Sequence, residues 1–128
     1  MILDSSALVA IVFNEPERET FIAKINAART VGIAAPTLVE AGVVLSSRSG
    51  GDAAKTLGEL LSASDVVVID FGSRHWREAI AAWVRFGKSR HPARLNFGDC
   101  LTYAAARVAD EPVLAKGDDF AQTDIELA

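Results

Sequence analysis

The stretch Met1-Ile-Leu-Asp-Ser-Ser-Ala-Leu-Val-Ala-Ile-Val-Phe13 places an apolar segment, an acidic residue and a second apolar segment in immediate succession. Residues 1–3 are predicted to form a buried strand. Residues 5–13 are predicted to form a helix, with Asp4 or Ser5 as its N-cap. A strand that passes directly into a helix is the building unit of an α/β fold.

The same alternation continues along the rest of the chain. Further helices are predicted at 16–29, 37–47, 53–63, 73–86 and 99–109, and further strands at 32–35, 66–69, 112–115 and, at an edge, 125–127. The run 66–69 is β-branched throughout, as a central parallel strand should be. Helix 37–47 is apolar nearly all round and is expected to be largely buried. The pattern predicts an α/β fold, a three-layer α/β/α sandwich with a mostly parallel central sheet, in one domain spanning 1–128.

Composition narrows the classes of protein that this chain can represent. Half of the 128 residues are hydrophobic, so we expect a well-buried core and no disorder. One cysteine and two histidines exclude an intrachain disulfide and give no zinc-site spacing. The apolar run near the N-terminus lacks the basic region of a signal peptide, and no apolar stretch approaches the roughly 20 residues of a membrane span. We expect a soluble protein in a reducing cytoplasm.

Charge is distributed unevenly along the chain. There are 13 basic and 17 acidic side chains, and the net charge of −4 argues weakly against a general nucleic-acid binder. The segment 85–98 nevertheless carries only basic charges, on Arg85, Lys88, Arg90 and Arg94. Taken alone, such a segment is more often a solvated loop than a site that holds a polyanion.

Acidic residues occur at four separate places in the sequence, each at a turn or within an apolar helix. They are Asp4, Glu40, Asp99 and the adjacent pair Asp118-Asp119. Sites in parallel sheets form outside the carboxyl ends of the strands. The predicted elements place the acids of all four segments towards this end of the sheet. Clustered carboxylates need a compensating cation, and a divalent metal with oxygen ligands is the natural one.

These acidic residues also have possible structural roles. Asp4 and Asp99 could serve helix N-termini, the latter with Asn96 as cap, and the Gly-Asp-Asp turn favours aspartate for backbone reasons. Glu40 is harder to explain, because apolar residues surround it and leave no polar face. An ion pair with an arginine and a role facing a metal are both open for Glu40.

These motifs resemble the PIN-domain ribonucleases, and in particular the VapC toxins of type II toxin–antitoxin systems. The resemblance rests on four segments in the right order, which cover nearly the whole chain: Asp-Ser-Ser-Ala-Leu-Val-Ala, Leu-Val-Glu-Ala, Arg-His-Pro-Ala-Arg-Leu-Asn-Phe-Gly-Asp-Cys and Lys-Gly-Asp-Asp-Phe. It implies an α/β sandwich whose acids bind Mg²⁺, with Mn²⁺ able to substitute, and hydrolyse RNA.

The resemblance also implies roles for individual residues and partners. Asp4, Glu40 and Asp99 match the first three family acids, and Asp118 is chosen as the fourth because Gly117 stands where many relatives have an acid. Asp119 is the substitute for Asp118, and Ser6 matches a hydroxyl that often lies beside the metal. Arg85, Lys88, Arg90, Arg94 and Lys116 are the expected contacts to RNA phosphates. The expected partners are a structured RNA such as tRNA, a VapB-like antitoxin and a second copy of the chain.

Two other classes of function remain as alternatives. One is a catalytically silent PIN-like module that binds RNA or a partner protein, against which the complete set of acids argues. The other is a phosphoryl-transfer domain of the receiver or haloacid-dehalogenase kind, with Asp70 at a strand end and Lys116 after a later strand. A receiver needs an acid pair after the first strand, and a dehalogenase needs an aspartate where Ser6 stands. Neither gives Glu40 a role.

Overall fold

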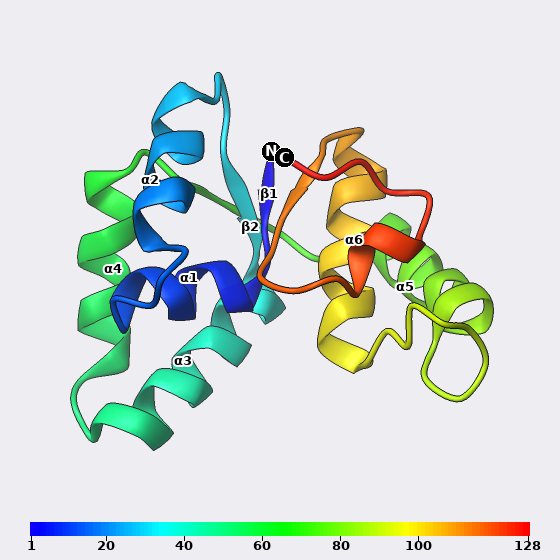
Figure 1. Ribbon diagram of the computed structural model, residues 1–128, viewed down its shortest axis with the longest axis horizontal. Coiled ribbons are helices and arrows are strands. Elements are labelled where there is room, and N and C mark those ends of the chain that lie inside the picture. The colour runs from blue at the N-terminus through cyan, green and yellow to red at the C-terminus, as the bar shows by residue number, and fades with distance from the viewer.

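The structure is a computed structural model that describes residues 1–128. Four short parallel strands form a sheet at its centre (Figure 1). The strands are β1 (Ile2–Leu3), β2 (Gly32–Ala34), β3 (Val67–Ile69) and β4 (Val113–Leu114). Their order is β3-β2-β1-β4, and every neighbouring pair is parallel. The register pairs Ile2 with Gly32 on one side and with Val113 on the other.

Helices cover both faces of this sheet. They are α1 (Ser5–Val12), α2 (Arg18–Ala27), α3 (Ala35–Ser49), α4 (Ala53–Ala63), α5 (Ser73–Phe86) and α6 (Phe97–Ala109), and a short 3₁₀ helix, η1 (Phe120–Gln122), follows β4. In Figure 1, α1 to α4 lie on one side of the sheet and α5 and α6 on the other. The predicted three-layer sandwich is confirmed, and its sheet is entirely parallel.

Alternate residues of β1, β2 and β4 contribute to two separate cores. Leu3 and Ile33 are completely buried among apolar residues of α1 to α4. Their neighbours Ile2 and Ala34 are buried on the opposite face, against α5 and α6. Successive strand side chains point to opposite faces, so even strands of two or three residues supply both cores.

The predicted position of the third strand is wrong. The β-branched run does form a strand, but β3 lies at the edge of the sheet. Val67 is 62% exposed and Val68 is 44% exposed, whereas a central strand would be covered on both faces. Strand order depends on how the helices pack, and the local composition of this run does not report it.

The predicted burial of the third helix is also wrong. Only Thr37, Ala41 and Leu45 of α3 are buried, while Val39 and Val43 are 66% and 60% exposed. Consequently α3 has an apolar face that nothing in the chain covers. Large exposed apolar patches commonly mark surfaces that bind other molecules.

The remaining element boundaries agree closely with the sequence-based ones. Predicted helix ends differ from the observed ends by at most two residues. The predicted edge strand at 125–127 is reduced to a single parallel bridge between Leu127 and Val113. No helix has the length and apolar character that crossing a membrane requires.

Candidate metal centre

Asp4 lies immediately after β1, at the carboxyl end of a central strand. Its backbone N–H donates to the carbonyl of Leu114 at 3.0 Å, which joins the ends of β1 and β4. The side chain is 4% exposed. Its Oδ2 accepts from the Ser6 N–H at 3.0 Å and the Ser6 hydroxyl at 2.6 Å, and its Oδ1 accepts from the Thr102 hydroxyl at 2.7 Å. Asp4 therefore caps α1, as predicted, and is held by two hydroxyl groups as well.

Asp99 lies in the first turn of α6, where it forms a capping box with Asn96. Its Oδ2 accepts from the Asn96 N–H at 2.7 Å, and the Asn96 side chain accepts from the Asp99 N–H at 2.9 Å. The Asp99 side chain is buried, with 8% exposure. Its Oδ1 accepts no hydrogen bond from the protein, so the capping role and a role in binding a ligand are compatible.

Glu40 projects from α3 towards the first turn of α6. A Cβ atom on Gly98 would stand 2.3 Å from Glu40 Oε1 and 2.5 Å from Oε2, so the carboxylate occupies the space that a side chain at 98 would fill. Its Oε2 is buried without a hydrogen-bond partner. Burial raises the pKa of Glu40, an interaction with the Ser5 side chain lowers it, and the charge of Asp4 raises it. No arginine neutralises Glu40, so the ion-pair alternative is not realised.

The Gly-Asp-Asp turn follows β4 and is exposed. Gly117 has φ of +90°, a conformation that favours glycine. Within this turn, Asp119 is close enough to the site for its charge to raise the pKa of Asp99. Of the Asp118-Asp119 pair, Asp119 is thus the residue with a visible electrostatic link to the other acids.

The charges of these acids act on one another. Burial is the largest cause that raises the pKa of Asp99 to about 6, and the charges of Asp4, Asp119 and Glu40 raise it further against the lowering effect of the Asn96 N–H. Acids from the end of β1, from α3 and from the turn after β4 therefore lie close enough to Asp99 of α6 for their charges to act on it. No cationic side chain lies among them in an ion pair.

The donor set of this acidic cluster fits a hard divalent cation. Neighbouring carboxylates raise the pKa of Asp99 and Glu40, and Glu40 Oε2 is buried without a hydrogen-bond partner. A divalent cation would stabilise the charged carboxylates of such a cluster. No three of the side chains stand as a ready cage around one point. Mg²⁺ does not need one, because it is usually held by one or two carboxylates and keeps several waters.

Four of the five predicted RNA-contacting residues lie in the segment 85–94, at the end of α5 and on the loop that follows it. Lys88, Arg90 and Arg94 are exposed on the loop between α5 and α6, which a pairing of Gly87 with Leu95 closes at its base. In Figure 1 this loop lies at the end of the molecule where α6 begins. Arg85, on α5, is exposed but forms an ion pair with Asp124 at 2.9 Å.

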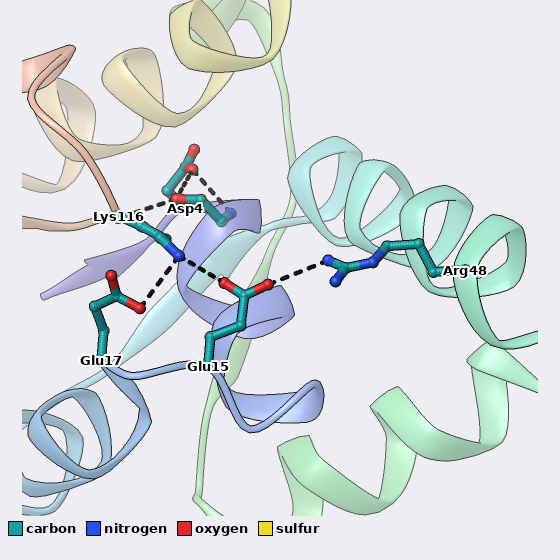
Figure 2. A network of polar contacts seen from close by, with 6 residues as sticks. Asp4, Glu15, Glu17, Arg48 and Lys116 are labelled. Atoms are coloured by element: carbon teal, nitrogen blue, oxygen red, sulfur yellow. Dashed lines mark hydrogen bonds and ion pairs between the residues drawn. The ribbon is translucent and has the colours of Figure 1, made fainter.

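Lys116 differs from the three loop residues because its ammonium, like the Arg85 guanidinium, is already paired with carboxylates. Its Nζ lies 2.9 Å from Glu15 Oε2 and 3.2 Å from Glu17 Oε2 (Figure 2). The backbone of Lys116 also takes part in the site, since its N–H donates to the Ser6 hydroxyl at 2.9 Å.

Three residues of the site were missed by the sequence analysis. Thr102 holds Asp4, Ser5 acts on Glu40, and Gly98 makes room for the Glu40 carboxylate. A signal existed for Thr102, because it follows Asp99 by three residues and therefore lies on the same face of α6. No local signal distinguishes the other two.

The chain is similar to known proteins over nearly its whole length. The family model described as PIN domain matches residues 1–126. The chain is 42% identical to Ribonuclease VapC36 of Mycobacterium tuberculosis, over 99% of the chain and 92% of that protein. It is 39% identical to Ribonuclease VapC28 of the same organism, over 100% of the chain and 97% of that protein.

Solved structures show the same fold at much lower sequence identity. The crystal structure of Mycobacterium tuberculosis VapC20, described as a Sarcin-Ricin loop cleaving toxin, superposes with a TM-score of 0.80 at 18% identity, covering 99% of the chain and 97% of that protein. A toxin–antitoxin complex from Klebsiella pneumoniae has a TM-score of 0.73 at 15% identity, covering 99% and 95%.

Proposed function

The chain belongs to the PIN-domain family as a VapC-type toxin, and on that premise we propose that it is an endoribonuclease that depends on Mg²⁺, or on Mn²⁺ in its place. The observation that carries the metal dependence is the mutual charge effect of Asp4, Glu40 and Asp119 on Asp99 with no cation to offset it. RNA as substrate is supported by the relatives, which are named as ribonucleases.

The four acids have different roles in binding one or more cations. Asp4 and Asp99 are the main ligands, because each carboxylate is buried and held in a fixed orientation by hydrogen bonds. Glu40 and an acid of the Asp118-Asp119 pair complete the site, directly or through water. A bound divalent cation supplies an activated water and neutralises charge on the scissile phosphate. Ser6 and Thr102 keep the Asp4 carboxylate in place through their hydroxyl groups.

The basic loop is proposed to bind phosphates on either side of the cut. Lys88, Arg90 and Arg94 carry exposed positive charges and occupy the loop that leads directly into the Asn96–Asp99 capping box. Arg85 is proposed to join them by exchanging its surface ion pair with Asp124 for a phosphate. A structured RNA, such as tRNA, suits a protein that offers one basic loop beside a recessed acidic site.

Two protein partners are also proposed. One is a cognate VapB-like antitoxin that neutralises the ribonuclease in the cytoplasm, which is supported by the likeness to a toxin–antitoxin complex. The other is a second copy of the chain. Trp76, Ile80 and Trp83 of α5 are 48%, 57% and 39% exposed, at helical spacing on one face.

The α5 face continues onto neighbouring elements. Together with Val39 of α3 and Phe97 of α6, residues of α5 line a groove of 660 Å³. Homodimer interfaces are more apolar than the average protein surface, so this groove suits contact with a second copy.

The phosphoryl-transfer alternative loses its support. Asp70 follows β3, which is an edge strand, and the ammonium of Lys116 is paired with Glu15 and Glu17. A receiver would need these two groups together with an acid pair after β1.

A cleavage assay tests the proposed function. Purified, antitoxin-free protein is incubated with structured RNAs in Mg²⁺ or Mn²⁺, and again with EDTA. We expect metal-dependent cleavage that EDTA stops and that Asp99→Asn abolishes while circular dichroism shows a folded protein. Cleavage that persists in EDTA would contradict metal dependence, and metal-bound protein that binds RNA without cutting it would favour the silent module.

A further inference from the structure

We propose that Lys116 is a positioning residue, and that its side chain anchors the segment after β4 so that its backbone N–H can orient the Ser6 hydroxyl and thereby the Asp4 carboxylate. The inference rests on the proposed function insofar as Asp4 holds a metal. It gives Lys116 a role that differs from direct contact with an RNA phosphate.

The backbone half of this arrangement is a directed chain of hydrogen bonds. The Lys116 N–H donates to Ser6 Oγ at 2.9 Å, and the Ser6 hydroxyl donates to Asp4 Oδ2 at 2.6 Å. A hydroxyl has one proton. Because Ser6 accepts from Lys116, its single proton is aimed at Asp4. Moving the Lys116 N–H away would free this hydroxyl to rotate and would remove one restraint from the Asp4 carboxylate.

The side-chain half fixes the same residue to the turn between α1 and α2. Lys116 Nζ lies 2.9 Å from Glu15 and 3.2 Å from Glu17, and the second oxygen of Glu15 accepts from Arg48 at 3.2 Å. Figure 2 shows Lys116 reaching across to both glutamates, with Arg48 of α3 on the far side of Glu15. Residue 116 is therefore held at its backbone by α1 and at its ammonium by the segment that follows α1.

The charges of this network balance within it. Two cations, Lys116 and Arg48, face two carboxylates, Glu15 and Glu17. The hydrogen bond to Lys116 is the largest cause that lowers the pKa of Glu15, and the hydrogen bond to Glu15 is the largest that raises the pKa of Lys116. A neutral set of paired charges offers little attraction to an approaching phosphate.

Lys116 also precedes the turn that carries the last acids. Gly117 reverses the chain with φ of +90°, and Asp118 and Asp119 follow it at once. An anchor at residue 116 therefore restrains the acids on both sides: Asp4 through Ser6, and Asp119 through the turn. Residues that orient metal ligands from outside commonly change metal affinity by about 10- to 100-fold when they are replaced.

Metal binding without RNA separates the positioning role from phosphate binding. Free Mn²⁺ is measured by electron paramagnetic resonance in titrations of the full chain and of Lys116→Met, Lys116→Arg, Glu15→Gln and the double variant Glu15→Gln/Lys116→Met. Methionine keeps an unbranched side chain only one atom shorter and the backbone N–H but removes the charge, while arginine keeps the charge. Asp4→Asn shows whether the measured Mn²⁺ occupies the proposed site.

The positioning role predicts a specific pattern among these variants. Lys116→Met weakens Mn²⁺ binding about 10-fold, Lys116→Arg restores most of it, and Glu15→Gln weakens it in the same direction. The double variant binds no more weakly than Lys116→Met, because both changes break one link. The salt dependence of RNA binding, measured in EDTA, does not change in Lys116→Met.

Two sets of results would contradict the account: one would contradict the positioning role of Lys116, and the other the metal centre itself. Unchanged Mn²⁺ affinity in Lys116→Met would contradict the positioning role. If Lys116→Met also has a shallower salt slope of RNA binding, or if Glu15→Gln binds RNA more tightly, Lys116 is a phosphate contact instead. Absence of Mn²⁺ binding in the unaltered protein, or full binding in Asp4→Asn, would instead contradict the proposed metal centre itself.

Discussion

Glu40 and Gly98 are in direct contact, and the contact depends on residue 98 having no side chain. A Cβ on Gly98 would lie 2.3 Å and 2.5 Å from the two carboxylate oxygens of Glu40. This close approach brings an acid of α3 beside the turn of α6 that carries Asp99. The glycine is needed for space, and its backbone conformation is one that other residues adopt.

Gly98→Ala is therefore expected to displace the Glu40 carboxylate. A displacement of about 1 Å in a catalytic group can cost about 100-fold in rate, so we expect a loss of RNA cleavage of that order. The fold should survive, because the end of a flexible side chain can move aside, and Tm should change by less than about 5 °C. Cleavage rates and thermal melts of the two proteins check this expectation.

Gly58→Ala is the matched control for that substitution. Gly58 lies within α4 with nothing near its missing Cβ, so alanine should leave activity unchanged and add about 0.5–1 kcal/mol of stability. Full activity in Gly98→Ala would show that the position of Glu40 does not matter.

The raised pKa of Asp99 predicts how stability depends on pH in the absence of metal. Asp99 ionises near pH 6 when folded, against an ordinary value of 3.8. Between these values the folded chain holds a proton that the unfolded chain has lost, so stability falls as pH rises from about 4 to 6, by about 3 kcal/mol in all. Asp99→Asn should escape this loss and be more stable than the unaltered protein at pH 7.5 in EDTA, with the difference shrinking towards pH 4.5.

Urea unfolding at the two pH values, with and without Mg²⁺, measures both consequences. Because the cation needs the ionised carboxylate, Mg²⁺ should stabilise the unaltered protein more at pH 7.5 than at pH 4.5 and should not stabilise Asp99→Asn. An Asp99→Asn protein that is less stable at pH 7.5 in EDTA would show that Asp99 stabilises the fold in its charged form.

The two acids after Gly117 are expected to contribute unequally. Only Asp119 has a visible charge effect on Asp99, whereas the sequence-based choice for the fourth acid is Asp118. We expect Asp119→Asn to reduce cleavage about 10-fold and Asp118→Asn to leave it within about twofold. The two variants serve as each other's control in single-turnover cleavage assays. The reverse order of effects would restore Asp118 as the fourth acid.

The basic loop predicts a change in the salt dependence of RNA binding. Each phosphate contact to a single strand contributes about 0.7 to the slope of log affinity against log salt. Arg90→Ala with Arg94→Ala should therefore weaken binding and lower the slope by about 1.4 in EDTA, where no cleavage occurs. Arg29→Ala with Lys55→Ala removes the same charge from exposed positions elsewhere and should change the slope much less. Equal slopes for the two double variants would exclude the loop as the phosphate contact.

The apolar face of α5 predicts an oligomer that one charge can disrupt. Ile80 is 57% exposed in the isolated chain, and burying a glutamate there without a partner would be costly. Light scattering after size exclusion should show a dimer for the unaltered protein and a monomer for Ile80→Glu. Thr20→Glu, an exposed position on α2 in the opposite helical layer, should stay dimeric. A monomeric unaltered protein would leave this face to another partner.

Much of the fold could be predicted because alternating apolar segments report secondary structure directly. The position of β3 could not be, since a β-branched run such as 66–69 marks a strand without telling whether neighbours cover it. The exposure of Val39 and Val43 was missed for a related reason. Apolar composition predicts that a surface will be buried, but it does not distinguish the chain's own core from a partner.

The acidic site was predictable as a set, but its supporting contacts were not. Asp4 and Asp99 cap helices as their local sequences suggest, and the same carboxylates face the acidic site. The hydrogen bond from Thr102 to Asp4 joins residues 98 positions apart. The spacing of Thr102 from Asp99 places both on one face of α6, but the contact with Asp4 depends on how α6 packs beside β1.

Anomalous scattering from crystals of the protein soaked in Mn²⁺ tests the central claim most directly, because it locates the ion without relying on activity. We predict a peak about 2.1 Å from carboxylate oxygens of Asp4 and Asp99, with Glu40 and Asp119 facing it directly or through water, and no such peak in Asp99→Asn. An Mn²⁺ ion bound elsewhere, with none among these four acids, would contradict the account.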